Sequence, residues 1–200
     1  MVLAGENMII TTNELSTQID GISNINNKIS RMLKNKEIYS LKKGLYETDI
    51  NANRYYLANK IYGPSYISFQ TALAFYNMIP EKVYGYYSAS MSLNKSKKYH
   101  NDFGTFCYKN IPSRCFPYGI ITIVENSVSF DIASKEKALC DMLYAYPIVN
   151  NIKEIKELLF DDLRIDLEIF KSLDKDIIYE YINLYRCKNV TLLAKYIKRI

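Results

Sequence analysis

Nine polar side chains near the N-terminus have the chemistry needed to contact DNA. An asparagine amide can bond adenine in bidentate fashion, an arginine can do the same with guanine, and a lysine neutralises phosphate. Seven of the nine fall within residues 24–34, and the other two form a Lys-Lys pair soon after. The set predicts a surface that contacts base edges and backbone together. Its members are Asn24, Asn26, Asn27, Lys28, Ser30, Arg31, Lys34, Lys42 and Lys43.

A short amphipathic helix over about residues 24–34 must position most of these side chains. The Asp20-Gly21 turn precedes Ser23. The Ser23 hydroxyl can cap a helix by accepting a hydrogen bond from a backbone N–H in the first turn of that helix. Apolar residues then recur at i, i+4, i+7 and i+8, which places them in one stripe for a core and leaves the polar side chains on the other faces. The stripe consists of Ile25, Ile29, Met32 and Leu33.

A basic hairpin is predicted after this helix. Residues 37–41 alternate polar and apolar side chains, Gly44 permits a tight turn, and residues 45–46 resume the apolar run. Lys42 and Lys43 at the tip would lie over phosphates or a minor groove, where charge raises affinity without specifying sequence. The same pattern also occurs in domains that bind no nucleic acid, in which a Lys-rich turn is simply solvated.

A supporting helix is predicted upstream of the turn. Thr11 and Glu14 have capping-box spacing, so a helix over about residues 12–19 is expected. Helix, turn, helix and hairpin in this order predict a winged helix-turn-helix. A complete winged domain normally begins with one more helix, whereas residues 1–10 predict a strand or an irregular lead.

Composition agrees with a globular chain that has a polyanionic partner. The 200 residues are 48% hydrophobic and 24% charged, with a formal net charge of +5. Between residues 28 and 43 there are six cations against one acid, so the charge is concentrated at the predicted motif. No apolar run reaches the ~18 residues that span a bilayer, and the N-terminus does not have the pattern of a signal peptide. We therefore expect a cytoplasmic protein that makes no membrane contact.

The rest of the chain predicts an α+β domain. A helix over residues 54–62 should end at Gly63-Pro64, and Ser65 should cap a second helix that ends near Pro80. Four β-rich runs follow, at residues 83–91, 103–108, 119–124 and 128–132, with a hairpin loop at 125–127. Ser134 should cap a helix that ends before Pro147. Further helices are predicted at 152–160, 167–173, 177–185 and 190–200.

The predicted organisation thus has two domains. Residues 1–48 form the winged helix-turn-helix, and residues 49–200 form a mixed domain with an antiparallel sheet and a helical C-terminal part.

Four sequence motifs carry a resemblance to a known family. They are residues 42–46 (KKGLY), 64–73 (PSYISFQTAL), 78–80 (MIP) and 137–141 (KALCD). In combination and in order they resemble AbiEi-type antitoxins of bacterial type IV toxin-antitoxin (abortive infection, phage defence) systems. The likeness runs from about residue 12 to at least residue 145. This family joins an N-terminal winged helix-turn-helix to a C-terminal antitoxin domain.

The resemblance implies a repressor of its own operon that also counteracts a cognate nucleotidyltransferase toxin, without necessarily forming a stable complex with it. DNA binding would belong to the helix at 24–34 and to the Lys42-Lys43 wing. Operators for such modules are often inverted repeats. Some members of the broader family are transcriptional regulators, so a stand-alone regulator without a toxin partner is the alternative.

A metal-dependent nuclease is the second alternative. Glu125, Asp131, Glu136 and Asp141 surround a predicted strand-to-helix junction, where carboxylates could hold Mg²⁺. Such a nuclease places an acid and a lysine one residue apart on a strand, whereas here Lys135-Glu136-Lys137 falls on a predicted helix. The cysteines have no CxxC spacing, and the single histidine, His100, is expected to be exposed in a polar loop. We therefore assign no catalytic, cofactor-binding or metal-binding residues.

Structural roles are predicted for the polar residues of the family motifs. Lys137 and Asp141 stand at i and i+4 on one helix, which indicates a surface ion pair contributing a few tenths of a kcal/mol. Ser65 and Ser68 are predicted to cap a helix and to face solvent.

Overall fold

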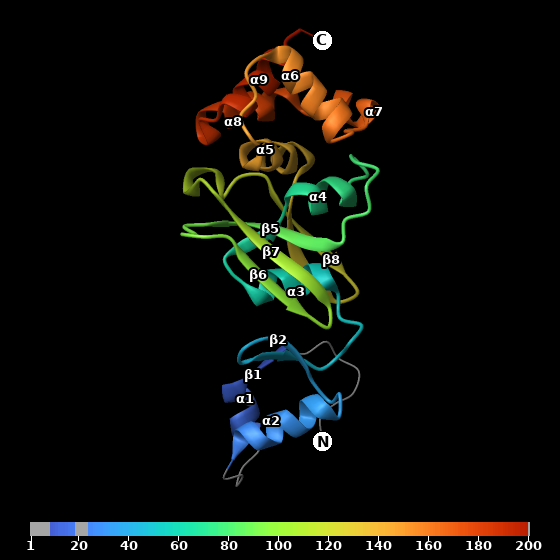
Figure 1. Cartoon of the computed structure of the whole chain (residues 1–200), viewed down its shortest axis with the longest axis vertical. Coiled ribbons are helices and arrows are strands. Elements are labelled where there is room, and N and C mark those ends of the chain that lie inside the picture. The colour runs from blue at the N-terminus through green and yellow to red at the C-terminus, as the bar shows by residue number, and fades with distance from the viewer. Residues whose placement is uncertain (1–8, 19–23, 200) are drawn as a thin grey trace.

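The computed structural model describes residues 9–18 and 24–199. Along its longest axis, a small N-terminal unit lies at one end, a six-stranded sheet in the middle and a group of helices at the other end (Figure 1). The fold is α+β, as predicted. No helix within the described ranges has both the length and the apolar content needed to cross a membrane.

The N-terminal unit has a hydrophobic core of its own. Its three strands form an antiparallel sheet in the order β1-β3-β2, with Gly44 at φ +80° in the turn between β2 and β3. The predicted apolar stripe is confirmed, because Ile29 and Met32 pack with Ile10 and Leu15. The elements are β1 (Ile9–Thr11), α1 (Thr12–Gln18), α2 (Ile25–Lys34), β2 (Tyr39–Lys42) and β3 (Leu45–Glu47).

Both helices of this unit start at side-chain caps. The capping box of α1 is confirmed: the Thr11 amide donates to Glu14 Oε2 at 2.7 Å, and the Glu14 amide donates to Thr11 Oγ1 at 3.3 Å. The cap of α2 is Asn24, whose Oδ1 accepts a hydrogen bond from the Asn27 amide at 3.2 Å. The predicted Asp20-Gly21 turn and the Ser23 cap lie outside the described residues.

The large sheet has the order β6-β7-β5-β4-β9-β8 and is mixed, so the prediction of an antiparallel sheet was wrong. β5 pairs in parallel with β7, and β4 in parallel with β9. Residue periodicity does not encode which strand pairs with which. The hairpin loop predicted at 125–127 is confirmed between the last two strands. The strands are β4 (Ser65–Ile67), β5 (Gly85–Met91), β6 (Lys97–Asn101), β7 (Gly104–Ile111), β8 (Ile120–Glu125) and β9 (Val128–Ala133).

Helices cover both faces of this sheet. α3 packs on one face, where the Tyr108 hydroxyl donates to the Ala58 carbonyl at 2.6 Å, whereas α4 and α5 lie on the opposite face (Figure 1). The C-terminal helices then pack onto α5. The elements are α3 (Arg54–Ile61), α4 (Phe69–Phe75), a 3-10 turn η1 (Ser113–Cys115), α5 (Lys135–Ala145), α6 (Ile152–Glu157), a π-helical turn η2 (Leu158–Asp162), α7 (Leu167–Lys171), α8 (Lys175–Tyr185) and α9 (Lys188–Ile197).

The prediction that a helix begins at Ser65 was wrong. Residues 65–67 form β4 in the sheet, and α4 begins only at Phe69. Tyr66 and Ile67 point to opposite faces of the sheet and are both fully buried. A short segment that is apolar on both faces does not show which period it follows.

The N-terminal unit contacts the large sheet through its hairpin. Leu41 is buried, and its carbonyl accepts a hydrogen bond from Asn101 Nδ2 at 2.9 Å. The Tyr39 ring meets the Phe103 ring edge-on, with centroids 6.0 Å apart. The hairpin is therefore held between α2 and the large sheet.

Candidate functional site

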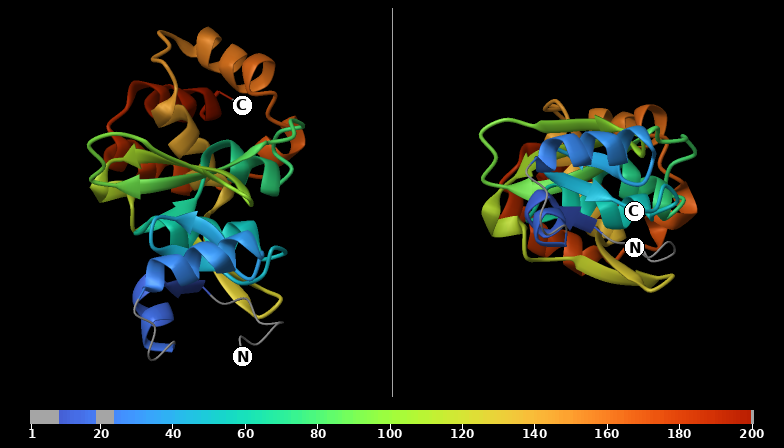
Figure 2. Two further views of the ribbon diagram at one scale, coloured as in Figure 1. Left: turned by 60° about the horizontal axis from the view of Figure 1, so that its bottom comes forward. Right: turned by 90° about the horizontal axis from the view of Figure 1, so that it is seen from below.

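The outer surface of α2 carries most of the predicted DNA-contacting side chains. Asn26, Asn27, Ser30, Arg31 and Lys34 are exposed and Lys28 is half-buried. Seen from below, α2 lies at the near end of the molecule (Figure 2). Because the apolar stripe faces the small core, these polar groups occupy the opposite side of the helix. The structure therefore brings together six of the nine predicted residues.

The cations of this surface have no acidic partner among the residues that the structure describes. Within residues 9–18 and 24–199, no salt bridge uses Lys28, Arg31 or Lys34. The nearest acid in the sequence, Glu37, instead accepts a hydrogen bond from the Asn35 side chain at 2.9 Å. No acid in the described part of the chain thus neutralises these guanidinium and ammonium groups.

Two of the predicted contact residues make hydrogen bonds within the protein. The Asn24 side chain caps α2 through its Oδ1. Lys42 is half-buried, and its Nζ donates to the Ile61 carbonyl at 2.5 Å, at the C-terminal end of α3. Lys43 remains exposed at the turn. The ammonium group of Lys42 is thus bonded to the end of α3, whereas Lys43, the first residue after β2, is exposed.

The four acids of the nuclease alternative do not converge. Glu125 accepts a hydrogen bond from Asn53 at 3.0 Å, and Asp131 accepts one from Thr122 at 2.7 Å. Glu136 accepts one from Ser134 at 3.0 Å. In the described part of the chain, no group of three or more His, Cys, Asp and Glu side chains is placed to hold a metal ion.

The fourth acid, Asp141, belongs to a buried polar cluster, and the prediction of a surface ion pair with Lys137 was wrong. Both side chains are fully buried, with Lys137 Nζ 3.3 Å from Asp141 Oδ1. The Ser68 hydroxyl donates to Asp141 Oδ2 at 2.6 Å, so the prediction that Ser68 faces solvent was also wrong. Ser65 is half-buried and donates to the Tyr62 carbonyl at 2.5 Å. We call Tyr66, Ser68, Lys137, Asp141 and Tyr185 the Lys137 cluster.

Every charge in the Lys137 cluster is compensated. Tyr66 and Tyr185 donate to the two Asp141 oxygens at 2.9 and 2.5 Å. Lys137 Nζ donates to the Cys115 carbonyl at 3.0 Å and to the Tyr185 hydroxyl at 2.6 Å. Burial, with the Asp141 charge beside them, raises the pKa of both phenols well above the usual value, which keeps them protonated donors. The cluster joins β4, α5, α8 and η1.

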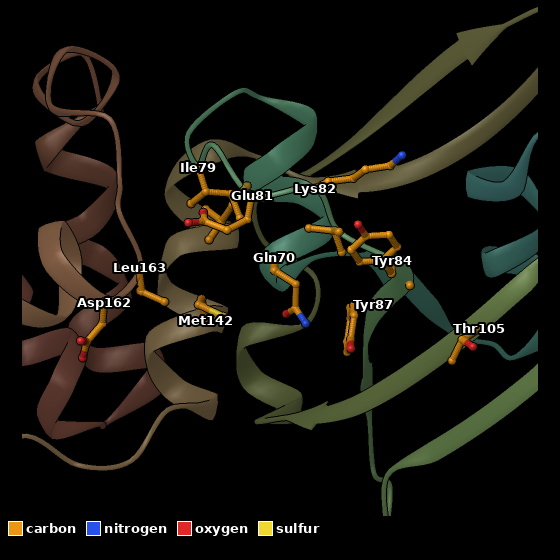
Figure 3. A pocket seen from close by; sticks show the side chains of 13 residues that line it. Gln70, Ile79, Glu81, Lys82, Tyr84, Tyr87, Thr105, Met142, Asp162 and Leu163 are labelled. Atoms are coloured by element: carbon orange, nitrogen blue, oxygen red, sulfur yellow. The ribbon is translucent and has the colours of Figure 1, made fainter.

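An open cavity of about 530 Å³ is a site that sequence reasoning missed. It lies between α4, the start of β5, α5 and the end of η2 (Figure 3). Apolar side chains dominate its walls, and Gln70, Tyr84 and Tyr87 supply polar and aromatic groups. Its lining comes from separate segments of the chain, so no local sequence pattern marks it.

His100 is exposed, as predicted, but it lies on strand β6 and not in a loop. Its Nδ1 is 3.0 Å from Thr105 Oγ1 on the neighbouring strand.

No known protein-family model matches the chain, and a search of curated proteins finds no significant match.

Proposed function

We propose that residues 1–48 form a winged helix-turn-helix that binds operator DNA through the outer surface of α2, and that the chain is a cytoplasmic AbiEi-type antitoxin. In this role it represses its own operon and counteracts a cognate nucleotidyltransferase toxin, with or without a stable complex. The observation that carries the proposal is the exposed, unpaired polar surface of α2, supported by a separate hydrophobic core.

The shape of the N-terminal unit supports α2 as the recognition helix. A B-DNA major groove, ~12 Å wide, admits an α-helix. α2 is preceded by a capped helix and followed by a hairpin, the order that a winged helix-turn-helix requires. Exposed side chains at positions 27, 30, 31 and 34 lie three or four residues apart, so they share one side of the helix.

The internal hydrogen bonds of the N-terminal unit support a smaller set of proposed contacts. We assign base and backbone contacts to seven residues and leave out Asn24 and Lys42, whose polar groups are bonded within the protein. The seven are Asn26, Asn27, Lys28, Ser30, Arg31, Lys34 and Lys43.

A gel-shift titration with the DNA upstream of the gene tests this assignment. We expect salt-sensitive binding that weakens in the Arg31→Ala/Lys34→Ala double variant, because two cations are lost without disturbing the core. Lys153→Ala, an exposed lysine on α6, is the matched control and should bind as the wild type does. Equal affinity of the double variant and the control would refute the α2 assignment.

Co-expression tests the antitoxin half of the proposal. A nucleotidyltransferase gene is expected next to this gene, and expressing the two together should restore growth that the toxin alone arrests. The Arg31→Ala/Lys34→Ala variant should still rescue growth, since the resemblance assigns antitoxin activity to residues 49–200. DNA binding without rescue would instead favour the stand-alone regulator.

A further inference from the structure

We propose that the cavity beside α4 binds a nucleotide, with the base against Gln70 and Tyr87 and the phosphate toward Lys98 and Lys109. This site is separate from α2 and does not depend on DNA binding there.

The cavity has the size and lining of a small-molecule site. At about 530 Å³ it falls within the roughly 300–1,000 Å³ of ligand pockets. Figure 3 shows Leu163 and Met142 on one side and Tyr87 and Thr105 on the other, with Gln70 between them. A flat ring could lie against the Tyr87 side chain while its edges meet Gln70.

Gln70 supplies a polar group that lacks a partner. Its Oε1 is buried, and it accepts no hydrogen bond from any described residue. A buried acceptor without a partner costs free energy, and a rotation that turns the Gln70 carboxamide into the cavity would let a donor on a ligand remove that cost. A carboxamide offers a donor and an acceptor side by side, which matches the edge of a nucleobase.

The wall that carries Gln70 is held rigidly. Phe69, the residue before it, is fully buried at φ +53°, a conformation that is strained for a bulky side chain. Ser68 fixes this turn, because its amide donates to the Tyr87 carbonyl at 2.9 Å and its hydroxyl bonds Asp141. Thr71 Oγ1 donates to the Gly85 carbonyl at 3.0 Å and accepts from the Tyr87 amide at 2.9 Å. Gln70 and Tyr87 therefore keep a fixed relation before any ligand arrives.

Cations continue from the cavity across the same face of the sheet. Tyr87 on β5 is level with Cys107 on β7, which is level with Lys98 on β6. Lys98 is thus two strand spacings, about 10 Å, from Tyr87. Lys109 follows Cys107 by two residues, so it shares this face, and its Nζ lies 5.5 Å from the Tyr87 ring centroid. Burial raises the pKa of Cys107, and the two nearby ammonium groups oppose that rise.

Glu81 and Asp162 line one side of the cavity, whereas the ammonium group of Lys82, which also lines it, extends over Tyr84 (Figure 3). Asp162 lines the side opposite Thr105 (Figure 3), and Glu81 is paired with Arg164 at 2.9 Å. In the described part of the chain Lys98 and Lys109 form no salt bridge. An anionic group is therefore drawn to the sheet side, while an apolar or neutral ring fills the cavity.

Isothermal titration calorimetry of the full chain tests the proposal. The probes are AMP, GMP, CMP and UMP, the corresponding nucleosides, ribose 5-phosphate and a short single-stranded oligonucleotide. At least one mononucleotide should bind, and Gln70→Leu should weaken that binding about tenfold or more. Lys98→Ala/Lys109→Ala should weaken the nucleotide but not the nucleoside. Tyr118→Ala and Lys153→Ala, an exposed tyrosine and an exposed lysine outside the cavity, should leave binding unchanged.

A stability measurement guards against misfolded variants. Gln70→Leu removes the unpartnered acceptor, so its unfolding temperature without ligand should equal or exceed that of the wild type. If only the oligonucleotide binds, and the Gln70→Leu variant does not bind it, the ligand is a nucleotide within a single-stranded nucleic acid and not a free mononucleotide. The proposal is refuted if no probe binds at about millimolar concentration, if ribose 5-phosphate binds as well as the nucleotides, or if Gln70→Leu binds normally.

Discussion

Lys34 and Lys137 show how differently this protein uses the same residue type. Lys34 stands on the outer surface of α2, exposed and without an acidic partner among the described residues. Lys137 is fully buried, 3.3 Å from Asp141, with its Nζ 4.7 Å from the centroid of the Tyr185 ring. An exposed cation costs the fold little and stays available to a ligand. A buried one is committed to its partners, so it can only hold the structure together.

The Lys137 cluster should therefore show the largest effect on stability. We expect Lys137→Met to lower the free energy of unfolding by about 3–5 kcal/mol, because the Asp141 charge would remain buried without its partner. Urea denaturation measures the change. The Lys137→Met/Asp141→Leu double variant is the control, and its loss should be smaller than the sum of the two single losses. An additive double variant would mean that the two charges do not interact.

Arg31 should show the reverse behaviour. Arg31→Ala is expected to weaken operator binding by about 1–3 kcal/mol if the guanidinium contacts a guanine, while the free energy of unfolding changes by less than about 0.5 kcal/mol. Gel shifts and urea denaturation on the same preparation measure both. A stability loss as large as that of Lys137→Met would place Arg31 in the structure and not in the interface.

Lys42 and Lys43 allow a lysine bonded within the protein to be compared with an exposed lysine at neighbouring positions of the hairpin. Lys42→Met should lower stability by about 1–2 kcal/mol through loss of the bond to the Ile61 carbonyl. It should leave the salt dependence of DNA binding unchanged. Lys43→Met should do the opposite, reducing the slope of log K against log salt by about 1. If the two variants behave alike, the hairpin does not separate the two side chains in solution.

The α1 capping box should give the smallest effect. Hydrogen bonds from the Thr11 amide and hydroxyl lower the pKa of Glu14 below its ordinary value of 4.5. Because the folded-state pKa is the lower one, the stabilisation is present above about pH 4.5 and is lost as the pH falls through the folded value. Glu14→Gln should thus be slightly less stable than the wild type at pH 7, and the difference should vanish in acid. Thermal unfolding across this pH range measures it.

The same contrast explains which elements could be predicted. The stripe of α2 and the capping box of α1 depend on residues close in the chain, and both were confirmed. The β8–β9 hairpin was predicted for the same reason. The strand at residues 65–67 and its parallel pairing with β9 were not predicted, because both depend on strands distant in the chain, β5 more than twenty residues away and β9 more than sixty.

The sequence by itself determined the exposed polar surface of α2, since helical period alone separates Arg31 and Lys34 from Ile29 and Met32. Only the tertiary structure decided that Lys137 and Asp141 are buried and that Lys42 is bonded within the protein. The i, i+4 spacing of Lys137 and Asp141 is the same on a surface helix and a buried one, and only the packing of β4 and α8 against α5 buries the pair. Likewise, nothing near Lys42 in the chain predicts that its ammonium group will donate a hydrogen bond to the Ile61 carbonyl at the end of α3.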